Sequence, residues 1–452
     1  MAQLAASFET AIPQPSATPR LVRAVGLLSL TAVALNGMIG SGIFLLPATV
    51  ARLLGPMSPL AYLVSGVAIL FIILCFAEVG SRFEHAGGPY LYARTAFGRF
   101  VGFEVGWMFF LTRLIAFAAI SNAFTAYLAY FWPAAGAGIG RVIVISVLLA
   151  MLAAINFVGI RQATWFVNLL TVGKLLPLLL LAFAGLFFID ARQFSFSALP
   201  PTAALRQASL VLIFAFGGFE LASVPSEEVI NPRRNLAIAL LAAVSLTGII
   251  YVLVQIVALG TVPQLATASA PLASSAQYFL GVLGGAIVAV GALLSTTGTN
   301  STTVLVGSRL LYAMAESGQL PGVLARVHAR YRTPHVALVA FSLGAWAIAM
   351  YSNFAELAAL SAIARTSYYL STCVALPVLR RKMPNSSRQF ALPGGALIPV
   401  AAVALSLWLL SGSTLTQAVL GAGALLAGAA IYLVQRWSAR ARSATASGST
   451  SR

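Results

Sequence analysis

The stretch that decides the fold is Gly37-Met38-Ile39-Gly40-Ser41-Gly42-Ile43-Phe44, a glycine-rich interruption in an apolar segment. Apolar residues predominate before it, from about residue 25, and after it, as far as Leu54. Glycine is a poor helix former and leaves the backbone accessible. At membrane depth, backbone groups without helical partners are tolerated only where protein buries them or a cavity lies beside them. The stretch therefore predicts a broken membrane helix whose free N–H and carbonyl groups face a small polar ligand.

A second glycine break, Phe216-Gly217-Gly218-Phe219-Glu220, interrupts the apolar segment that runs from about residue 205 to residue 229. Two interrupted segments at corresponding places in two halves of a chain indicate the binding site of a transporter. The alternative is that these glycines only allow helices to pack closely. We interpret the two breaks as parts of one binding site.

The composition predicts an all-α membrane protein, because 60% of the residues are hydrophobic and only 8% are charged. Segments of about 20 apolar residues are typical of transmembrane helices. We expect a transporter domain over residues 25–436, between cytosolic, disordered tails at 1–24 and 437–452. Twelve transmembrane helices are predicted, at 25–54, 58–80, 100–131, 140–159, 164–189, 206–230, 236–260, 279–313, 335–351, 357–379, 396–412 and 415–436.

The net charge of +17 could indicate a nucleic-acid partner, but its placement argues against one. With both termini in the cytosol, 20 of the 27 Lys and Arg residues fall on the cytosolic side and four on the outer side. The other three, Arg113, Lys174 and Arg365, fall within membrane segments. This asymmetry is the positive-inside rule. It predicts a multi-pass protein of the cell membrane, surrounded by lipid, with both termini cytoplasmic and no nucleic-acid partner.

The sequence lacks the motifs of an enzyme or a metal site. Cys75 and Cys373 both lie in apolar segments, and the three histidines fall in cytosolic loops without zinc-ligand spacing. No serine-elbow or phosphate-loop motif is present. We therefore expect no catalytic residue, no metal and no cofactor. A channel or a membrane sensor on the same fold is the alternative to a transporter.

Four motifs in order along the chain carry a resemblance. They are Gly40-Ser41-Gly42, Ala86-Gly87-Gly88-Pro89-Tyr90, the Glu-Glu-x-x-Asn-Pro-x-Arg stretch at 227–234, and Arg309-Leu310-Leu311-Tyr312-Ala313-Met314 before Gly318-Gln319-Leu320-Pro321. Over nearly its whole length the sequence resembles the amino acid–polyamine–organocation transporter superfamily. The resemblance implies a LeuT-like fold of two inverted five-helix repeats, with discontinuous first and sixth helices and two peripheral helices, the eleventh and twelfth.

The same resemblance implies a function and a substrate site. The protein is expected to carry an amino acid or a related amine by alternating access, through sodium-independent exchange or proton-coupled uptake. The sequence does not decide between a monomer and a homo-oligomer. The substrate's carboxylate is expected on N–H groups of Ser41 and Gly42, and its ammonium at carbonyls of Met38, Phe214 and Gly217. The expected substrate-binding residues are Met38, Gly40, Ser41, Gly42, Arg113, Phe214, Phe216, Gly217, Gly218 and Phe219. For the aromatic residues among them, plain packing is the alternative.

Lys174 is expected to take part in coupling or gating. A lysine at mid-membrane costs roughly 2.5–3.5 kcal/mol on insertion scales, so a function is the default reading. By resemblance, its ammonium lies against the break in segment 25–54, where sodium-coupled relatives hold a sodium ion. It could also carry a proton. The alternative is a side chain that snorkels to the cytosolic interface.

Three further charged residues lie in predicted membrane segments. Glu220 is expected beside the gate, either as a titrating group or as a carboxylate held by neighbouring N–H groups. By resemblance, Arg113 faces the substrate's side chain and favours neutral or acidic amino acids over basic ones. Alternatively, Arg113 pairs with Glu104 or Glu220, because buried charges are usually paired. Arg365 could line the pocket or cap a helix.

Overall fold

The structure is a computed structural model that describes residues 26–83, 88–158, 173–194, 200–223, 230–384, 391–392 and 395–449. In these ranges every regular element is a helix, which confirms the predicted all-α class. A helix at Gly173–Phe188 accompanies the labelled ones. The α-helices are α1 (Leu27–Met38), α2 (Gly42–Leu54), α3 (Ser58–Gly80), α4 (Gly88–Phe97), α5 (Arg99–Leu128), α6 (Gly138–Val158), α8 (Thr202–Phe216), α9 (Pro232–Thr261), α10 (Pro271–Glu316), α11 (His335–Tyr351), α12 (Phe354–Lys382), α13 (Leu397–Leu410) and α14 (Leu415–Ser449).

The helices have the lengths and apolar character of a multi-pass membrane protein. In the described part of the chain, seven helical stretches are long and apolar enough to cross a membrane, and four shorter apolar helices accompany them. Each of the twelve predicted segments overlaps one or more of the helices. The seven stretches are Gly42–Gly80, Arg99–Leu128, Gly138–Val158, Thr202–Ala222, Arg234–Thr261, Pro271–Glu316 and Leu415–Trp437.

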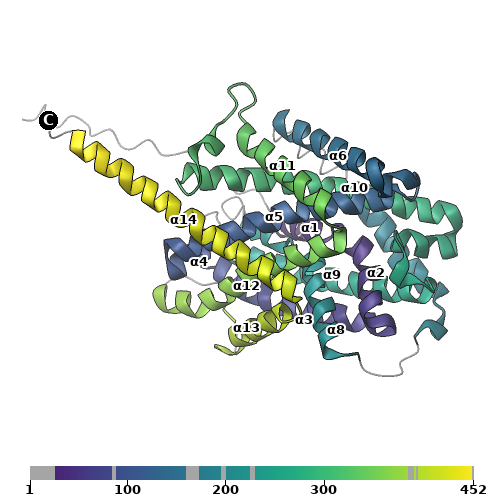
Figure 1. The fold of residues 1–452 in the computed structure, drawn as a ribbon. Helices are drawn as coiled ribbons and strands as arrows, with labels where there is room; N and C mark the ends of the chain where they lie inside the picture. The colour runs from purple at the N-terminus through teal and green to yellow at the C-terminus, as the bar shows by residue number, and fades with distance from the viewer. Residues whose placement is uncertain are drawn as a thin grey trace, which may run out of the picture.

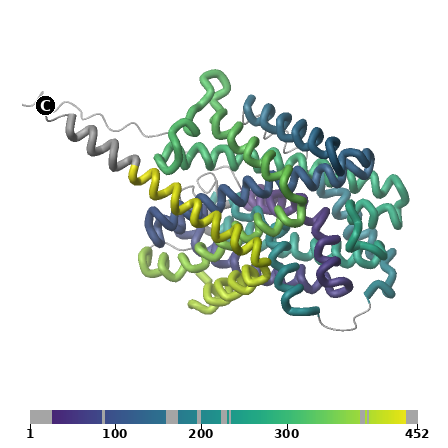
Figure 2. Tube along the Cα trace, in the orientation of Figure 1, coloured from purple at the N-terminus to yellow at the C-terminus, as the bar shows by residue number. Residues whose placement is uncertain are grey.

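The C-terminal helix differs from the expectation. α14 continues to Ser449, so it is helical well past residue 436, where a disordered tail was expected. Alanine and arginine, both good helix formers, recur over residues 439–444 and let the membrane helix continue. α14 crosses the outside of the bundle and projects beyond it, as Figures 1 and 2 show. The expected N-terminal tail lies outside the described residues.

Long helices pack against the short helices α1 and α2. α5 packs along both α10 and α12, and α9 packs along α3 and α1. α2 contacts α8 over much of its length and is buried along most of it. In Figure 1, α1 lies between α5 and α9; Leu28 near its start is 86% exposed, whereas the chain from Met38 to Phe44 is buried. The first glycine break therefore lies in the interior of the bundle.

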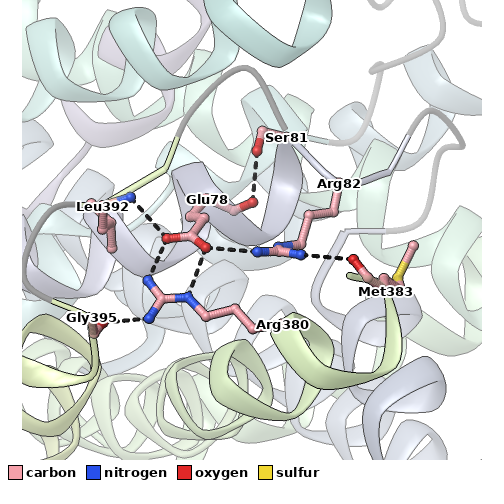
Figure 3. A network of polar contacts seen from close by, with 7 residues as sticks. All are labelled: Glu78, Ser81, Arg82, Arg380, Met383, Leu392 and Gly395. Carbon is pink, nitrogen blue, oxygen red and sulfur yellow. Dashed lines mark hydrogen bonds and ion pairs between the residues drawn. The ribbon is translucent and has the colours of Figure 1, made fainter. Parts of the chain in front are cut away.

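A buried ion cluster joins the end of α3 to the end of α12 (Figure 3). The carboxylate of Glu78, fully buried, accepts hydrogen bonds from Arg82 Nη2 at 2.9 Å and from Arg380 Nη2 at 2.6 Å. The N–H of Leu392 also donates to it, at 3.0 Å. Arg82 Nη1 donates in addition to the carbonyl of Met383, at 3.3 Å. Because one buried carboxylate serves two guanidinium groups, the cluster holds this end of the bundle together.

Candidate functional site

The first break separates two half-helices, as the sequence predicted. α1 ends at Met38 and α2 begins at Gly42. The end of α1 is closed by a hydrogen bond from the N–H of Ile39 to the carbonyl of Leu35, at 2.8 Å. The first N–H groups of α2 have no partner within the helix and form its partially positive end. They face the three-residue gap between the two half-helices.

The second break follows α8 and begins in an extended conformation. α8 ends at Phe216, and Gly217 has φ −81° and ψ 161°. Gly218 follows with φ +114°, a conformation that side chains with a Cβ rarely adopt. A 3₁₀ turn at Phe219–Ser223 continues the chain. The predicted break is confirmed, and the glycine at its centre is required by its backbone geometry.

The two breaks contact each other directly. A Cβ on Gly218 would overlap the carbonyl oxygen of Gly37, and a Cβ on Gly42 would lie 2.7 Å from Cα of Ala215. These glycines therefore allow close packing, as the alternative interpretation held. They also bring the N-terminal end of α2 against α8, where the second half of the site begins. The same glycines thus pack closely and line the candidate site.

A small cavity of about 30 Å³ lies between the breaks, room for water but not for an amino acid. Eight of the ten predicted substrate-binding residues line it. The described residues that line the cavity are Gly37, Met38, Gly40, Ser41, Gly42, Arg113, Ala116, Ile120, Phe214, Gly217, Gly218, Thr299, Thr303 and Arg365.

The other two predicted residues, Phe216 and Phe219, do not line the cavity. The ring of Phe216 packs edge-to-face on Tyr251, with 5.2 Å between centroids. The ring of Phe219 packs on Phe76, at 5.3 Å, and on Tyr369, at 5.0 Å. For these two aromatic residues the packing alternative describes the structure. Their segment is buried on every side, so its sequence pattern did not show which face meets the cavity.

The carbonyl of Met38, which was expected to accept from the substrate's ammonium, is hydrogen-bonded to Tyr251. The tyrosine hydroxyl donates to the carbonyl oxygen of Met38 at 2.8 Å, and the N–H of Gly40 donates to the same oxygen at 2.9 Å. The carbonyl expected to meet a substrate ammonium thus already has two donors. Sequence reasoning missed Tyr251, a lone hydroxyl-bearing ring that is buried in an apolar stretch of α9.

Lys174 lies at the end of α1, as the resemblance implied. Its side chain is only 2% exposed, and Nζ donates to the carbonyl of Asn36 at 3.0 Å and to that of Ile39 at 2.6 Å. These carbonyls form the partially negative end of the first half-helix. The snorkelling alternative is wrong, because the ammonium is buried against the break.

Glu220 lies at the centre of a second polar cluster. Its Oε1 forms an ion pair with Arg113 and accepts a hydrogen bond from the Tyr368 hydroxyl at 2.9 Å. Its Oε2 accepts from the N–H of Gly218 at 2.9 Å and from the Tyr369 hydroxyl at 2.8 Å. The carboxylate is therefore held by neighbouring donors. Neither tyrosine was singled out from the sequence.

Arg113 thus pairs with Glu220 and not with Glu104. The carboxylate of Glu104 has no hydrogen-bond partner among the described residues. Arg113 lines the cavity nevertheless, and its Nε has no hydrogen-bond partner in the described ranges. Arg113 therefore forms an ion pair with Glu220 and also lines the cavity.

Arg365 lines the cavity rather than capping a helix. It is 3% exposed, and within the described part of the chain its Nε and Nη1 have no hydrogen-bond partner. A Cβ on Gly217 would overlap the guanidinium, so this glycine makes room for it. The buried hydroxyls of Ser41 and Thr299 are likewise without hydrogen-bond partners there. The wall of the cavity therefore carries more donors than the single carboxylate of the cluster accepts.

The described residues contain no cluster of three or more His, Cys, Asp or Glu that could hold a metal ion. Cys75 and Cys373 are both buried free thiols. The groups that meet at the breaks are backbone dipoles, hydroxyls and charged side chains, of which Arg113 and Glu220 form an ion pair.

Comparison with known proteins shows that the chain is similar to membrane transporters over nearly its whole length. A methylthioribose transporter of Bacillus subtilis is 28% identical over 411 residues, 87% of this chain and 89% of the relative. A serine/threonine exchanger of the same organism is 30% identical over 421 residues, 89% of this chain and 93% of the relative. Cationic amino acid transporter 4 of Mus musculus is 29% identical over 408 residues, 85% of this chain and 64% of the relative. The family model described as amino acid permease matches residues 25–434. The chain therefore belongs to the amino acid permease family, whose members are membrane transporters and not enzymes.

Proposed function

We propose that this protein is a secondary transporter that carries an amino acid across the cell membrane by alternating access. The observation that supports this most is the contact between the two breaks beside a cavity that is too small for an amino acid. The positive end of α2, with Ser41 and Gly42, suits a carboxylate. A cavity of about 30 Å³ has to widen before an amino acid can enter. That widening, first toward one side and then toward the other, is the proposed transport cycle.

The proposed transport does not need sodium. Lys174 Nζ donates to two carbonyls at the end of α1, so a fixed cation already occupies the place where a coupling ion would bind. This arrangement supports sodium-independent exchange or proton-coupled uptake. The relatives are named as transporters and an exchanger, which does not favour a channel or a sensor.

The proposed substrate is neutral or acidic rather than basic. Arg113 and Arg365 both line the cavity, and Glu220 is the single carboxylate of their cluster in the described part of the chain. Arg365 keeps two unpartnered nitrogen donors within the described residues, which an acceptor on the substrate would satisfy. A basic side chain would add a further cation to this excess of positive charge.

The proposed topology is the predicted one of twelve spans and two inverted repeats. The two glycine breaks support it, because they fall at corresponding places in two halves of the chain. The distribution of Lys and Arg supports cytoplasmic termini, with the tails 1–24 and 437–452 on that side and the domain 25–436 between them.

A thermal-unfolding screen of the purified protein against the twenty amino acids tests the proposed function. A ligand at a hundred times its Kd stabilises the folded state by about 2.7 kcal/mol. We expect a few neutral or acidic amino acids to raise the unfolding midpoint. The amide of each stabilising amino acid, which lacks the carboxylate, is the matched control and should not raise it. Equal midpoints with all twenty amino acids would contradict the proposal.

A further inference from the structure

A second and much larger cavity lies outside the candidate site. Its volume is about 680 Å³, and it opens where α4 ends, α5 begins, α10 ends and α14 passes. Figure 1 shows α14 crossing beside α4 and α5. None of its lining residues belongs to the substrate cavity. Its position on the outside of the bundle suits a ligand that is not transported.

Three arginines from three different helices line this cavity. They are Arg94 of α4, Arg99 of α5 and Arg436 of α14, and all three are exposed. The ion pairs found among the described residues involve only the carboxylates of Glu78 and Glu220, so none of the three arginines has a carboxylate partner there. The cavity therefore brings together three positive charges that form no salt bridge within the described part of the chain.

No acidic group among the described residues forms a salt bridge with the three arginines, and two polar side chains beside them have other partners. Glu316, at the end of α10, accepts a hydrogen bond from the Tyr312 hydroxyl at 2.9 Å. Gln319 lines the cavity, and its Nε2 donates to the Tyr90 hydroxyl at 2.7 Å. Its buried Oε1 has no partner among the described residues and can accept from a hydroxyl. The cavity thus offers cationic donors and one neutral acceptor.

The surroundings of the cavity are apolar. Phe100 and Tyr432 pack edge-to-face on its wall, with 5.3 Å between centroids. Leu433 and Trp437, on the adjoining turns of α14, are largely exposed. Tryptophan at the end of a membrane helix is typical of the level of the lipid headgroups. A ligand here would meet cations at one end and hydrocarbon at the other.

We propose that this pocket, formed by Arg94, Arg99, Arg436 and Gln319, binds the phosphate of an anionic phospholipid. Guanidinium groups bind phosphate oxygens through paired N–H donors. Basic pockets between membrane helices are suited to anionic lipid headgroups. A headgroup that bridges the three arginines ties the peripheral helix α14 to α4 and α5. This assignment does not depend on which solute the protein carries.

Titration of phosphatidylglycerol into the purified protein, with phosphatidylcholine as the neutral lipid, tests the proposal through the thermal-unfolding midpoint. We expect phosphatidylglycerol, and not phosphatidylcholine, to raise the midpoint. Each arginine near an anionic lipid surface contributes about fivefold to affinity. The triple variant Arg94→Gln, Arg99→Gln, Arg436→Gln should therefore need on the order of a hundredfold more phosphatidylglycerol for the same shift.

The matched control removes three exposed arginines elsewhere, through Arg326→Gln, Arg330→Gln and Arg332→Gln, and should respond like the wild type. An equal response of both triple variants, or no response of the wild type to phosphatidylglycerol, would overturn the proposal. A third titration, with inorganic phosphate, distinguishes a free anion from a lipid headgroup. If phosphate alone at the same concentration gave the same arginine-dependent shift, the site would take a free anion and the assignment to lipid would be wrong.

Discussion

Replacing Arg365 by methionine should remove the discrimination of the site against basic substrates. The guanidinium is 3% exposed, lines the cavity and has two donors without a hydrogen-bond partner in the described ranges. A substrate cation at ~6 Å, with an effective dielectric constant of ~20, is repelled by about 3 kcal/mol. That energy corresponds to about a hundredfold in affinity. Methionine keeps an unbranched side chain of related shape and removes the charge.

The assay is competition for uptake of a labelled amino acid that stabilises the wild type. The ratio of the inhibitory concentrations of arginine and glutamate should fall by one to two orders of magnitude in Arg365→Met. Gly217→Ala is a companion variant, because its Cβ would overlap the guanidinium and displace it. Gly66→Ala is the control, since its Cβ would lie at an ordinary 3.7 Å from the ring of Phe216.

An unchanged ratio in a folded Arg365→Met protein would refute this reasoning. In that case the charge of Arg365 would not act on the substrate's side chain. Another group would balance it, and the pair of Arg113 and Glu220 alone would set the selectivity. Strong inhibition of the wild type by arginine alone, and not by glutamate, would refute the proposed sign of the site.

Three other predictions concern coupling, the first break and stability. Replacing sodium by choline should leave initial uptake rates unchanged, because Lys174 supplies the cation at α1; a steep sodium dependence would contradict that role. Gly42→Leu should abolish ligand-induced stabilisation and lower the unfolding midpoint, because even a Cβ would lie 2.7 Å from the α8 backbone; wild-type binding would place the site elsewhere. Gly66→Ala, which lies outside the cavity and would place its Cβ at an ordinary 3.7 Å from the ring of Phe216, is again the control. Glu78→Gln should cost about 3–5 kcal/mol of unfolding free energy, because it removes the carboxylate that two guanidinium groups share; an unchanged midpoint would show that the cluster adds no stability.

The two breaks and the position of Lys174 could be predicted from the sequence. Glycine-rich stretches and a lysine can be accommodated inside an apolar membrane segment in only a few ways. Glycine-rich stretches at membrane depth either pack closely or expose backbone, and the structure shows close packing at Gly42 and Gly218, both of which also line the cavity. A lysine ten residues into an apolar segment needs acceptors nearby. The end of a broken helix supplies them, in the carbonyls of Asn36 and Ile39.

The orientation of side chains around buried helices could not be predicted in the same way. α8 is buried on all sides near the break, so apolar periodicity does not distinguish Phe214, which lines the cavity, from Phe216, which does not. The pairing of Arg113 with Glu220 was one of two alternatives, and only the packing of α5 against the second break decides between them. The place of Arg365 depends on how α12 is rotated, which one sequence does not specify.

The helical C-terminal end was missed for a different reason. Its charged and small residues suggested a solvated tail, yet several of them favour a helix that is already nucleated by a membrane segment. Composition alone does not show where such a helix stops, and α14 reaches Ser449.

Uptake into proteoliposomes, with and without unlabelled substrate inside, tests the central claim most directly. The proposed alternating-access carrier should show saturable uptake of an amino acid identified by the stability screen. Internal substrate should accelerate the entry of label, because a loaded carrier returns to the outside for the next cycle. Uptake that rises linearly with concentration and does not respond to internal substrate would contradict the account.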